Sequence, residues 1–551
     1  MSIPIRWSKF TPQISTRNLV GLSAVMVTLL FLLQGNIGFN LADEGFLWYG
    51  TIRTAVGEVP VRDFQSYEPG RYYWGALWFK LLQNDGILAL RVSQSAFQFV
   101  GLGLALLLLR RLVRSWIALI LAAGILARWM YPTWKIYEPI ILIAAIYIAV
   151  LIIEEPSKRR HLMAGIFVGL AAFFGRNHGL YCFVAFVLLL VYLNWASDKR
   201  VLLQRLGVMS LGIIIGYLPM LFMFAFVPGF LSQFQEDLLF NLNYGTNLSL
   251  PVPWPWRQSY QFAGAREIIH RVTVGTLFLV LPAFYIFALP RLFFRRASNL
   301  HPVFIASAFL GVIYLHYTFA RPQLFYVAWT IPPFILGLLA VPASFSNEHR
   351  KKMQIAVWSV LIVLTIGALE MAQENYFTIK IKSLAKAKLI RSYGDYDEAM
   401  NAQGLLKTDV RGDTLWVLSD TATTMDRMKA SNQNFIESND QILIAPYFPG
   451  LYAVLQKRSP FWEIYFLFPR PLKEQEAMVR DLESKRVNWA LVCNHYMDNR
   501  PDLDFRHTHN LIWDYLIENF EPVATSVPDC ELMRRVTSNT WLPAQPVRDK
   551  G

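Results

Sequence analysis

The residues best suited to chemistry gather in one stretch, Leu41 to Trp74, which directly follows the first long apolar run. Asp43 and Glu44 stand at its start, immediately beyond that run. Ionisable side chains so close to hydrocarbon are costly and tend to be functional. The same stretch contains further acids and three arginines, which are Glu58, Asp63, Glu68, Arg53, Arg62 and Arg71. We predict that Asp43 acts as a general base, with Glu44 as its acidic partner.

Cationic side chains recur near the ends of later apolar runs. They are Lys135, Arg176, His178, His316 and Arg321, and Glu138 lies close to Lys135. An acid that activates an acceptor, together with cations that hold a phosphate and stabilise its departing charge, suits the transfer of a group from an anionic, lipid-tethered donor. The pattern therefore favours group-transfer chemistry at a membrane surface.

Each of these residues also has a structural interpretation. Asp43 and Glu44 can cap a helix, and Arg62 with Asp63 fits a local ion pair better than direct chemistry. Glu68 precedes a Pro-Gly turn signal. Interfacial anchoring would explain Arg176 and His178, a tight turn would explain Arg321, and a helical pair would explain Lys135 with Glu138.

The composition indicates a polytopic membrane protein. The 551 residues are 54% hydrophobic and 17% charged, and apolar runs approach the roughly 20 residues that cross a bilayer. We expect eleven spans, near 18–38, 88–109, 114–130, 138–153, 161–176, 179–196, 206–228, 272–290, 301–318, 324–341 and 355–371. The first run is long enough to remain as a span, so no cleavable signal peptide is expected.

The chain has a net charge of +13. From Ala372 onward 24 acidic residues outnumber 22 basic ones, so the positive excess lies in the apolar region before Ala372. The excess lies in short connections between spans, where it sets orientation and does not indicate nucleic acid. Six clusters fall at every second connection: Arg6, Lys9 and Arg17; Arg110, Arg111 and Arg114; Lys158, Arg159 and Arg160; Lys199 and Arg200; Arg291, Arg295 and Arg296; Arg350, Lys351 and Lys352. We therefore expect an inner (plasma) membrane protein with its N-terminus in the cytoplasm.

This topology divides the chain into a transmembrane domain at 1–371, whose long first extracytoplasmic loop is 39–87, and a small extracytoplasmic domain at 372–551. The second domain reads as α/β. Short β-like runs occur at 414–420, 441–448 and 487–494, and an amphipathic helical segment lies between the last two. Cys493 and Cys530 both fall in this domain, where either a disulfide or two unpaired thiols would be compatible with the sequence.

Four motifs carry a resemblance to a known family. They are DEGFLWYG at 43–50, GEVPVRDFQSYEPGRYYW at 57–74, GRNHG at 175–179 and FARPQLFY at 319–326. With them the chain resembles the GT-C superfamily of polyprenyl-phosphate-sugar-dependent glycosyltransferases, in the branch of protein O-mannosyltransferases, aminoarabinose transferases and RgtA-like proteins. The stretches 446–460 and 475–492 are similar to the small periplasmic domain of such proteins.

The resemblance implies roles for individual residues. Asp43 matches the catalytic base and Glu44 its frequent acidic neighbour, whereas Glu138 stands where many relatives have Asp, and Val61 where Tyr is usual. The expected substrate-binding residues are Arg62, Asp63, Glu68, Arg71, Tyr72, Lys135, Glu138, Arg176, His178, His316 and Arg321. Some relatives use a divalent cation such as Mg²⁺ or Mn²⁺, for which Asp43, Glu44 and Glu138 offer oxygen ligands.

The function expected from these features is inverting transfer of a sugar, hexosyl or pentosyl, from a polyprenyl-phosphate donor to an acceptor hydroxyl. The acceptor is a glycan, a lipid or a protein. The main competing hypothesis is a transporter or flippase for an anionic lipid-linked saccharide, which would need no acid-rich loop and would favour repeats or broken helices near mid-membrane. A sensor that binds envelope polymers ranks last.

Overall fold

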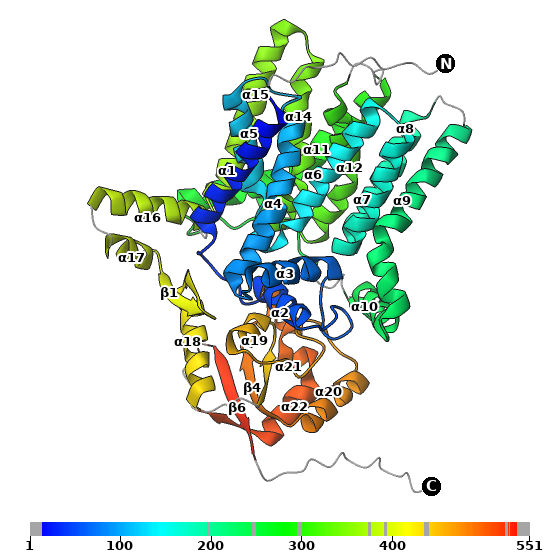
Figure 1. Ribbon diagram of the computed structural model, residues 1–551. Coiled ribbons are helices and arrows are strands. Elements are labelled where there is room, and N and C mark those ends of the chain that lie inside the picture. The colour runs from blue at the N-terminus through cyan, green and yellow to red at the C-terminus, as the bar shows by residue number, and fades with distance from the viewer. Residues whose placement is uncertain are drawn as a thin grey trace. The chain divides into compact units, whose positions relative to one another are not determined.

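The computed structural model describes residues 14–195, 199–244, 249–294, 300–372, 376–390, 394–434, 440–523, 527 and 529–536. The basic residues Arg6, Lys9, Arg295 and Arg296 lie outside these ranges. The chain forms two compact units (Figure 1). The first comprises residues up to 36 and 67–396, and the second comprises 37–66 and 397–551. A domain boundary at 371 remains a prediction, since these units divide the chain elsewhere and join part of the first loop to the C-terminal region.

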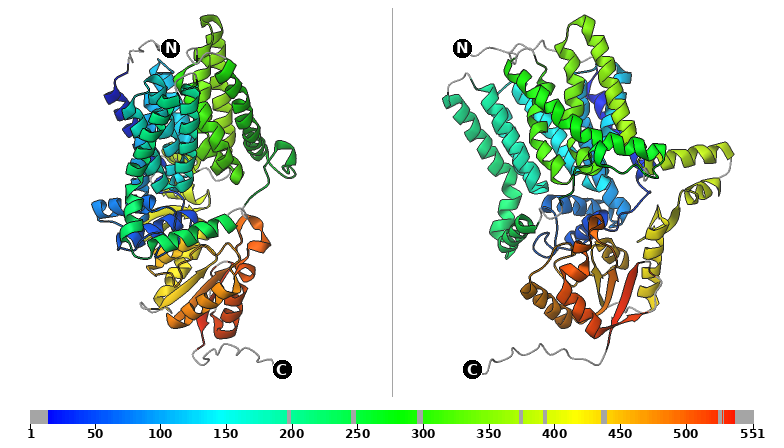
Figure 2. Two further views of the ribbon diagram at one scale, coloured as in Figure 1. Left: turned by 90° about the vertical axis from the view of Figure 1, so that its right-hand side faces the viewer. Right: turned by 180° about the vertical axis from the view of Figure 1, so that it is seen from behind.

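The first unit is helical. Its helices are α1 (Thr16–Gln34), α3 (Pro69–Leu82), α4 (Ile87–Leu109), α5 (Trp116–Trp129), α6 (Tyr137–Glu154), α7 (Lys158–Phe174), α8 (Arg176–Leu193), α9 (Lys199–Phe226), α10 (Phe230–Tyr244), α11 (Ala265–Phe294), α12 (Pro302–Ala320), α13 (Leu324–Thr330), α14 (Pro332–Ala340), α15 (Asn347–Thr365) and α16 (Tyr376–Ile390). The long helices run side by side as a bundle in all views (Figure 2). The next helix, α17 (Gly394–Asn401), contributes its first residues to this unit.

Eight described helices are long and apolar enough to cross a membrane. They are α1, α4, α6, α8, α9, α11, α12 and α15 with its short continuation to Glu370, and the pair α13 and α14, bent by 51°, makes a ninth if it is one span. Each of the eleven expected spans lies on a helix or on this pair. The two expected spans outside this set lie on α5, an apolar helix of 14 residues, and on α7, which has 17, so both are shorter than the roughly 20 residues typical of a span, and the number eleven stays a prediction.

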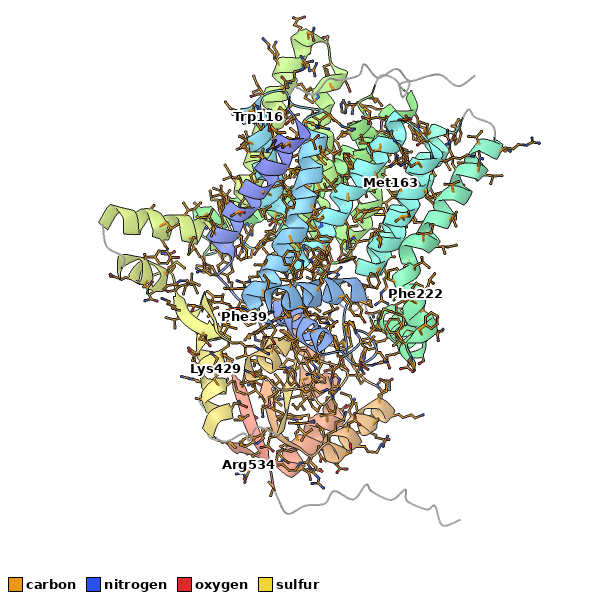
Figure 3. The ribbon with its side chains drawn as sticks, viewed as in Figure 1. Phe39, Trp116, Met163, Phe222, Lys429 and Arg534 are labelled. Carbon is orange, nitrogen blue, oxygen red and sulfur yellow. A yellow bond between two sulfur atoms is a disulfide. The ribbon has the colours of Figure 1, made fainter. Side chains whose placement is uncertain are left out.

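Apolar side chains also cover the outside of this bundle. Met163 and Phe222 are 38% and 56% exposed, and Trp116 at the start of α5 is 43% exposed (Figure 3). Large apolar surfaces of this kind are rare on water-soluble monomers and match a lipid environment. The protein is therefore a polytopic helical membrane protein.

The second unit is a small α/β assembly. Its strands are β1 (Leu405–Val410), β2 (Asp413–Leu418), β3 (Gln441–Ala445), β4 (Val487–Cys493), β5 (Phe520–Val523) and β6 (Cys530–Arg535). Its helices are α2 (Asp43–Ala55), α18 (Ser419–Asn434), α19 (Pro449–Leu455), α20 (Leu472–Ser484), α21 (Phe505–Thr508) and α22 (Asn510–Asn519). The strands β1 and β2 pair alone, and the larger sheet has the order β3-β4-β6-β5, with β3 parallel to β4 and the other pairs antiparallel.

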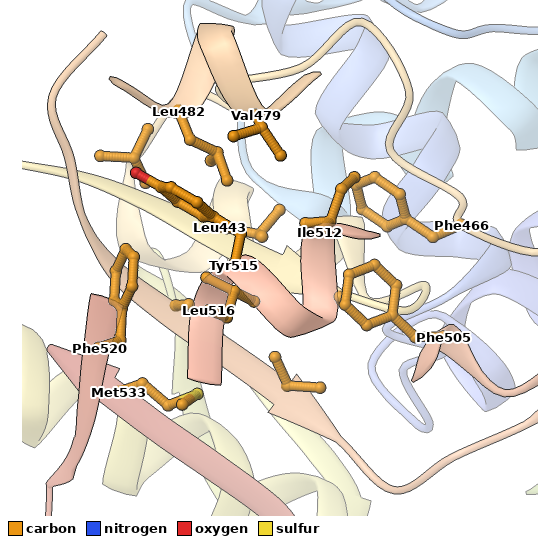
Figure 4. Packing of buried hydrophobic residues seen from close by; sticks show 14 of the residues in the cluster. Leu443, Phe466, Val479, Leu482, Phe505, Ile512, Tyr515, Leu516, Phe520 and Met533 are labelled. Atoms are coloured by element: carbon orange, nitrogen blue, oxygen red, sulfur yellow. The ribbon is translucent and has the colours of Figure 1, made fainter. Parts of the chain in front are cut away.

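Helices α20 and α22 contribute the apolar faces that cover this sheet. Val479 and Leu482 of α20 and Leu516 of α22 pack with Leu443 of β3, and each is at most 2% exposed (Figure 4). Burying one such side chain contributes about 1.5–3 kcal/mol. The predicted strands near 414–420, 441–448 and 487–494 and the amphipathic helix before the last are all present.

A disulfide joins two strands of the sheet. Cys493 ends β4 and Cys530 begins β6, and the two residues face each other in the antiparallel register. The structure thus decides in favour of the disulfide, a question that the sequence left open for these cysteines.

Candidate functional site

Asp43 is the first residue of α2 in the second unit. The side-chain carbonyl of Asn40 accepts hydrogen bonds from the backbone N–H of Ala42 at 2.9 Å and of Asp43 at 2.8 Å, which caps the incoming chain. Asp43 Oδ1 accepts a hydrogen bond from the hydroxyl of Tyr465 at 3.3 Å. The Asp43 side chain is half-buried, and acids in a first helical turn complement the helix dipole. A carboxylate held in this way keeps acceptor capacity for a further proton donor.

The backbone of α2 is fixed by close contact with α19. A Cβ atom on Gly45 would lie 2.5 Å from the backbone N and Cα of Gly450, so neither helix tolerates a side chain at the crossing. The hydroxyl of Tyr49, farther along α2, accepts a hydrogen bond from the backbone N–H of Ser459 at 2.9 Å. The C-terminal part of the chain therefore positions the helix that begins with Asp43.

An aromatic cluster surrounds the same end of α2. The Tyr465 ring lies 4.6 Å from that of Phe46 and 6.2 Å from that of Tyr447, which follows β3. The exposed His495, which follows β4, lies 5.8 Å from Tyr447. These residues follow the carboxyl ends of two parallel strands, which is where ligands commonly bind in α/β sheets.

Two other acids of the first loop, Asp63 and Glu44, make local contacts in the structure. Arg62 and Asp63 form a two-contact ion pair at 2.7 and 2.8 Å, and Asp63 also accepts from the backbone N–H of Val59. The arginine lowers the pKa of Asp63 below its ordinary value. Glu44 is fully buried, and its carboxylate accepts from the backbone N–H of Asn40 at 3.5 Å. These contacts match the structural interpretation of Arg62 and Asp63.

A buried chain of ion pairs crosses the first unit. Arg176, at the start of α8, donates from Nε to Glu68 and from Nη2 to Asp237 of α10 at 2.6 Å. The side chains of Glu68 and Asp237 are 9% and 5% exposed. Phe234, one turn before Asp237, places its ring 5.5 Å from the guanidinium. Three elements that are distant in sequence thus meet at one arginine.

The two acids respond differently to this arginine. Burial disfavours the charged form of Glu68, but attraction by Arg176 and also by Arg71 is stronger, so the pKa of Glu68 lies below its ordinary value. Burial dominates at Asp237, which Arg176 attracts and Glu68 repels, so its pKa is raised. The Glu68 carboxylate is therefore the firmly charged partner.

A second pair lies beside the first. Arg71 Nη1 of α3 donates to Glu138 Oε1 of α6 at 2.8 Å, and Arg71 Nε donates to the carbonyl of Phe174 at 2.6 Å. Burial opposes the charge on Arg71, but Glu138 and Glu68 outweigh it and raise its pKa. Glu138 pairs with Arg71 here, and it also interacts electrostatically with Lys135 and His178.

Tyr67 joins these ion pairs to Lys135. The Lys135 ammonium lies 3.6 Å from the centre of the Tyr67 ring, and the Arg71 guanidinium lies 5.1 Å from it. The Tyr67 backbone N–H donates to the hydroxyl of Tyr72 at 3.1 Å, and burial raises the pKa of Tyr72. Cations on an aromatic face are attracted to it, so Tyr67 holds both cations in place.

The remaining cations lie along an aromatic cluster on α8 and α12. The ring of His178 is 5.8 Å from Tyr314 and 5.4 Å from Tyr317. His316 Nδ1 is 2.8 Å from the hydroxyl of Tyr181, a residue that also contacts both tyrosines. Arg321 is the C-cap of α12, directly after this cluster. The structure thus ties His178 and His316 to tyrosines, while Glu68, Arg71, Lys135, Glu138 and Arg176 form the ionic network of the first unit.

Two atoms in this network stand out. Arg176 Nη1 and Glu138 Oε2 are buried without a hydrogen-bond partner in the described part of the chain. Leaving a buried polar group unpaired costs about 1–3 kcal/mol. The other two nitrogens of Arg176 donate to acids, so Nη1 is the nitrogen of this side chain that has no partner among the described residues.

Oxygen ligands for a metal are less well supplied. Over the described residues, no group of three or more His, Cys, Asp or Glu side chains is arranged to hold a metal ion. Glu138 is engaged by Arg71, and Asp43 accepts from Tyr465. The divalent cation therefore stays a prediction.

Sequence reasoning missed three residues of these clusters, namely Asp237, Tyr465 and Tyr67. Asp237 had a usable signal, because Phe234 and Asp237 are three residues apart and share one face of a helix. Tyr465 had none, since it is separated from Asp43 by more than four hundred positions and only the fold brings them together.

The fold matches that of solved glycosyltransferase structures. ArnT from Cupriavidus metallidurans bound to undecaprenyl phosphate superposes with a TM-score of 0.53 at 15% identity, over 95% of this chain and 99% of that chain. ArnT in the apo state gives a TM-score of 0.50 at 14% identity, over 95% and 98%. The oligosaccharyltransferase of Archaeoglobus fulgidus reaches only 0.45 at 12% identity, over 88% and 70%. The two ArnT structures show that the chain has the GT-C fold.

Sequence comparison gives less. No family model matches the chain. No curated protein matches it either. The resemblance to the GT-C superfamily is thus confirmed at the level of the fold, and the roles of single residues rest on their geometry.

Proposed function

We propose that this protein is an inverting glycosyltransferase that moves a sugar from a polyprenyl-phosphate donor to an acceptor hydroxyl. The observation that carries the proposal is the GT-C fold over nearly the whole chain, shared with an ArnT structure that contains undecaprenyl phosphate. The buried Nη1 donor of Arg176 supports it, because a phosphate oxygen is the kind of acceptor that an arginine binds strongly.

Asp43 is assigned the role of general base. Its carboxylate takes the proton of the acceptor hydroxyl, the resulting oxygen forms a bond to C1 of the sugar, and the bond between C1 and the phosphate oxygen breaks. Attack from the face opposite to the phosphate inverts the configuration at C1. General-base assistance typically contributes about 10²–10⁴-fold to the rate.

Arg176 is assigned to the departing phosphate. It keeps two carboxylates on its other nitrogens, so its guanidinium is already oriented and needs little rearrangement when charge develops on the leaving group. Lys135 and Arg71 add positive charge around the Tyr67 ring. Glu68 and Asp237 act on the reaction through Arg176 and are positioning residues.

The proposed setting is the inner membrane. The alternating basic connections between the expected spans support an N-terminus in the cytoplasm and a C-terminal region on the other side. The donor would enter from the lipid, and the acceptor would be a glycan, a lipid or a protein on that extracytoplasmic face.

The test is the release of labelled sugar from a panel of polyprenyl-phosphate sugars in nanodiscs, with envelope extract as the source of acceptor. The wild type should release sugar and Asp43→Asn should not, while both bind the donor. Asp420→Asn is a matched control, since Asp420 lies in the first turn of another helix of the same unit, and it should retain activity.

Three results would overturn the proposal in different ways. Turnover by Asp43→Asn near that of the wild type would remove Asp43 from the role of base. Movement of intact lipid-linked saccharide across vesicles without transfer would favour the flippase. If the wild type releases no sugar with any donor and any extract, the flippase is likewise favoured.

A further inference from the structure

A cavity with both polar and apolar walls lies inside the first unit, among helices that the proposed chemistry does not use. It is bounded by the end of α1, the first turns of α4, the end of α5 and the turn that follows α5. The side chains with polar groups in its lining are Gln34, Arg91, Gln94, Ser95, Gln98, Arg128, Tyr131 and Thr133. The five residues of the ionic network, which are Glu68, Arg71, Lys135, Glu138 and Arg176, are not part of the lining.

Gln94 is the residue that points to a ligand. It is 2% exposed, and both its amide nitrogen and its amide oxygen are buried without a hydrogen-bond partner among the described residues. A glutamine amide in hydrocarbon surroundings carries a large desolvation cost when it is left unpaired. The neighbouring Gln98, one helical turn further, is 7% exposed and lines the same cavity. Two stacked amides thus face a space that a polar group can fill.

The charge of the lining is positive. Arg91, 6% exposed, donates from Nη1 to the carbonyl of Gly35 at the end of α1, at 2.8 Å. Arg128 pairs with Glu370 at 2.8 Å, and its guanidinium lies 4.4 Å from the ring centre of Phe377 on α16. No acidic side chain is among the described residues that line the cavity. Guanidinium and amide donors together suit a phosphate group.

The rest of the lining is apolar. It consists of Leu30 and Phe31 of α1, Gly35, Ala127 of α5, Met130 after α5 and Ile136 before α6. Helix α1 leaves most of its length exposed, with only Leu19, Ser23 and Val27 buried along it, so the cavity lies behind a helix that faces lipid. A ligand with a phosphate headgroup and hydrocarbon chains matches a lining of this kind, because its two parts meet the two kinds of wall.

The cavity also lies near the ends of the spanning helices, where lipid headgroups are expected. It is at the end where α1 finishes and α4 begins, and α16 runs beside that end of α1 (Figure 1). Lys380 of α16 donates to the side chain of Asn36, directly after α1. Cationic side chains at the ends of spans lie where phospholipid headgroups are found.

We propose that this cavity binds the phosphate headgroup of an anionic membrane phospholipid. Arg91 and Arg128 attract the phosphate, Gln94 and Gln98 donate hydrogen bonds to its oxygens, and the acyl chains follow the apolar side of α1. The site is independent of sugar transfer, and lipid binding is measured without any turnover, so its failure and the failure of the proposed function are distinguishable.

The experiment measures lipid binding to the delipidated full-length protein by native mass spectrometry, with phosphatidylglycerol and phosphatidylcholine added in steps. Gln94→Leu removes both polar atoms with little change in volume, and Gln94→Glu adds a carboxylate that occupies the place of the phosphate. Gln204→Leu is the matched control, since Gln204 is an exposed glutamine on the spanning helix α9, outside the cavity.

The wild type and Gln204→Leu should prefer phosphatidylglycerol over phosphatidylcholine. Gln94→Leu should lose about tenfold in phosphatidylglycerol affinity, the effect of one hydrogen bond to a charged group, and Gln94→Glu should lose more. The thermal stability of lipid-free Gln94→Leu should equal or exceed that of the wild type, because an unpaired buried amide is gone.

Equal phosphatidylglycerol binding by the wild type and both Gln94 variants would overturn the site. So would a wild type that does not distinguish the two lipids. Displacement of phosphatidylglycerol by millimolar inorganic phosphate would refute the assignment of the site to a lipid headgroup, and would show that it binds free phosphate.

Discussion

Arg176 offers the sharpest test of the ionic network, through Arg176→Lys. The substitution keeps the positive charge but replaces the planar guanidinium, which has three nitrogens, by an ammonium group with a single nitrogen. In the structure Nε and Nη2 each hold a separate carboxylate, from Glu68 and from Asp237, while Nη1 has no partner among the described residues. A single ammonium cannot replace all three directions.

The size of the effect follows from these contacts. If Nη1 donates to the donor phosphate, its loss removes one hydrogen bond between charged groups, about 1.5–3 kcal/mol, which corresponds to about a 10- to 150-fold rise in the donor Kd. Weakening the bond to one carboxylate costs about 1–3 kcal/mol of stability in addition. Arg176→Met would be a poorer choice, since it leaves two buried acids unpaired at a cost of about 3–5 kcal/mol and endangers folding.

The assay is binding of a polyprenyl-phosphate sugar to purified protein in nanodiscs, with thermal unfolding measured on the same samples. The matched control is Arg111→Lys, because Arg111 is another arginine in an ion pair, with the single carboxylate of Glu154 at 2.6 Å. Its side chain is 20% exposed, against 26% for Arg176. The control should lose some stability and retain donor affinity. An Arg176→Lys protein that binds the donor like the wild type would refute the assignment of Nη1 to the phosphate.

Three further predictions concern the supporting structure. Gly45→Ala drives a Cβ into the backbone of α19, so we expect a loss of about 1–3 kcal/mol of stability and reduced turnover, whereas Gly21→Ala on α1, with open space around it, should be neutral; equal effects would contradict the contact. The pKa of Glu68 is depressed, so its contribution to stability is present above its ordinary value near 4.5 and is lost as the pH falls through the folded-state value. Between about pH 6 and pH 3 the melting temperature of the wild type should therefore fall more steeply with pH than that of Glu68→Gln. Parallel curves of melting temperature against pH would argue against the ion pair. Cys493→Ala removes the disulfide, which links residues 37 positions apart in the sequence, and should destabilise the second unit by about 4 kcal/mol. Urea unfolding measures this difference in stability, which should disappear when both proteins are reduced.

Much of the fold was predictable because its causes are local. Long apolar runs predict spanning helices wherever they occur, and each of the eleven predicted segments is helical. The helices α5 and α7, which carry two of these segments, stop after 14 and 17 residues, shorter than the other predicted spans on single helices. The short β-like runs at 441–448 and 487–494 likewise predicted β3 and β4.

The site was predictable only in part. Glu68, Arg71, Glu138, Lys135 and Arg176 were all selected because ionisable residues near spans are costly, and the structure does bring these five together in the first unit. It also shows a residue that sequence reasoning missed, which is the second acid on Arg176. Asp237 lies in a stretch rich in apolar residues, and its role depends on how α10 folds back onto the start of α8.

The sequence by itself determined that this is a multi-pass membrane protein with a small α/β region, and it indicated the acids and cations that matter, because hydrophobicity and charge are properties of single residues and short runs. The tertiary structure alone decided which of these residues pair. It placed residues 37–66 with the C-terminal region, set Tyr465 against Asp43, and left one nitrogen of Arg176 without a partner among the described residues. Such pairings depend on the packing of segments hundreds of residues apart, and no local pattern in the chain records that packing.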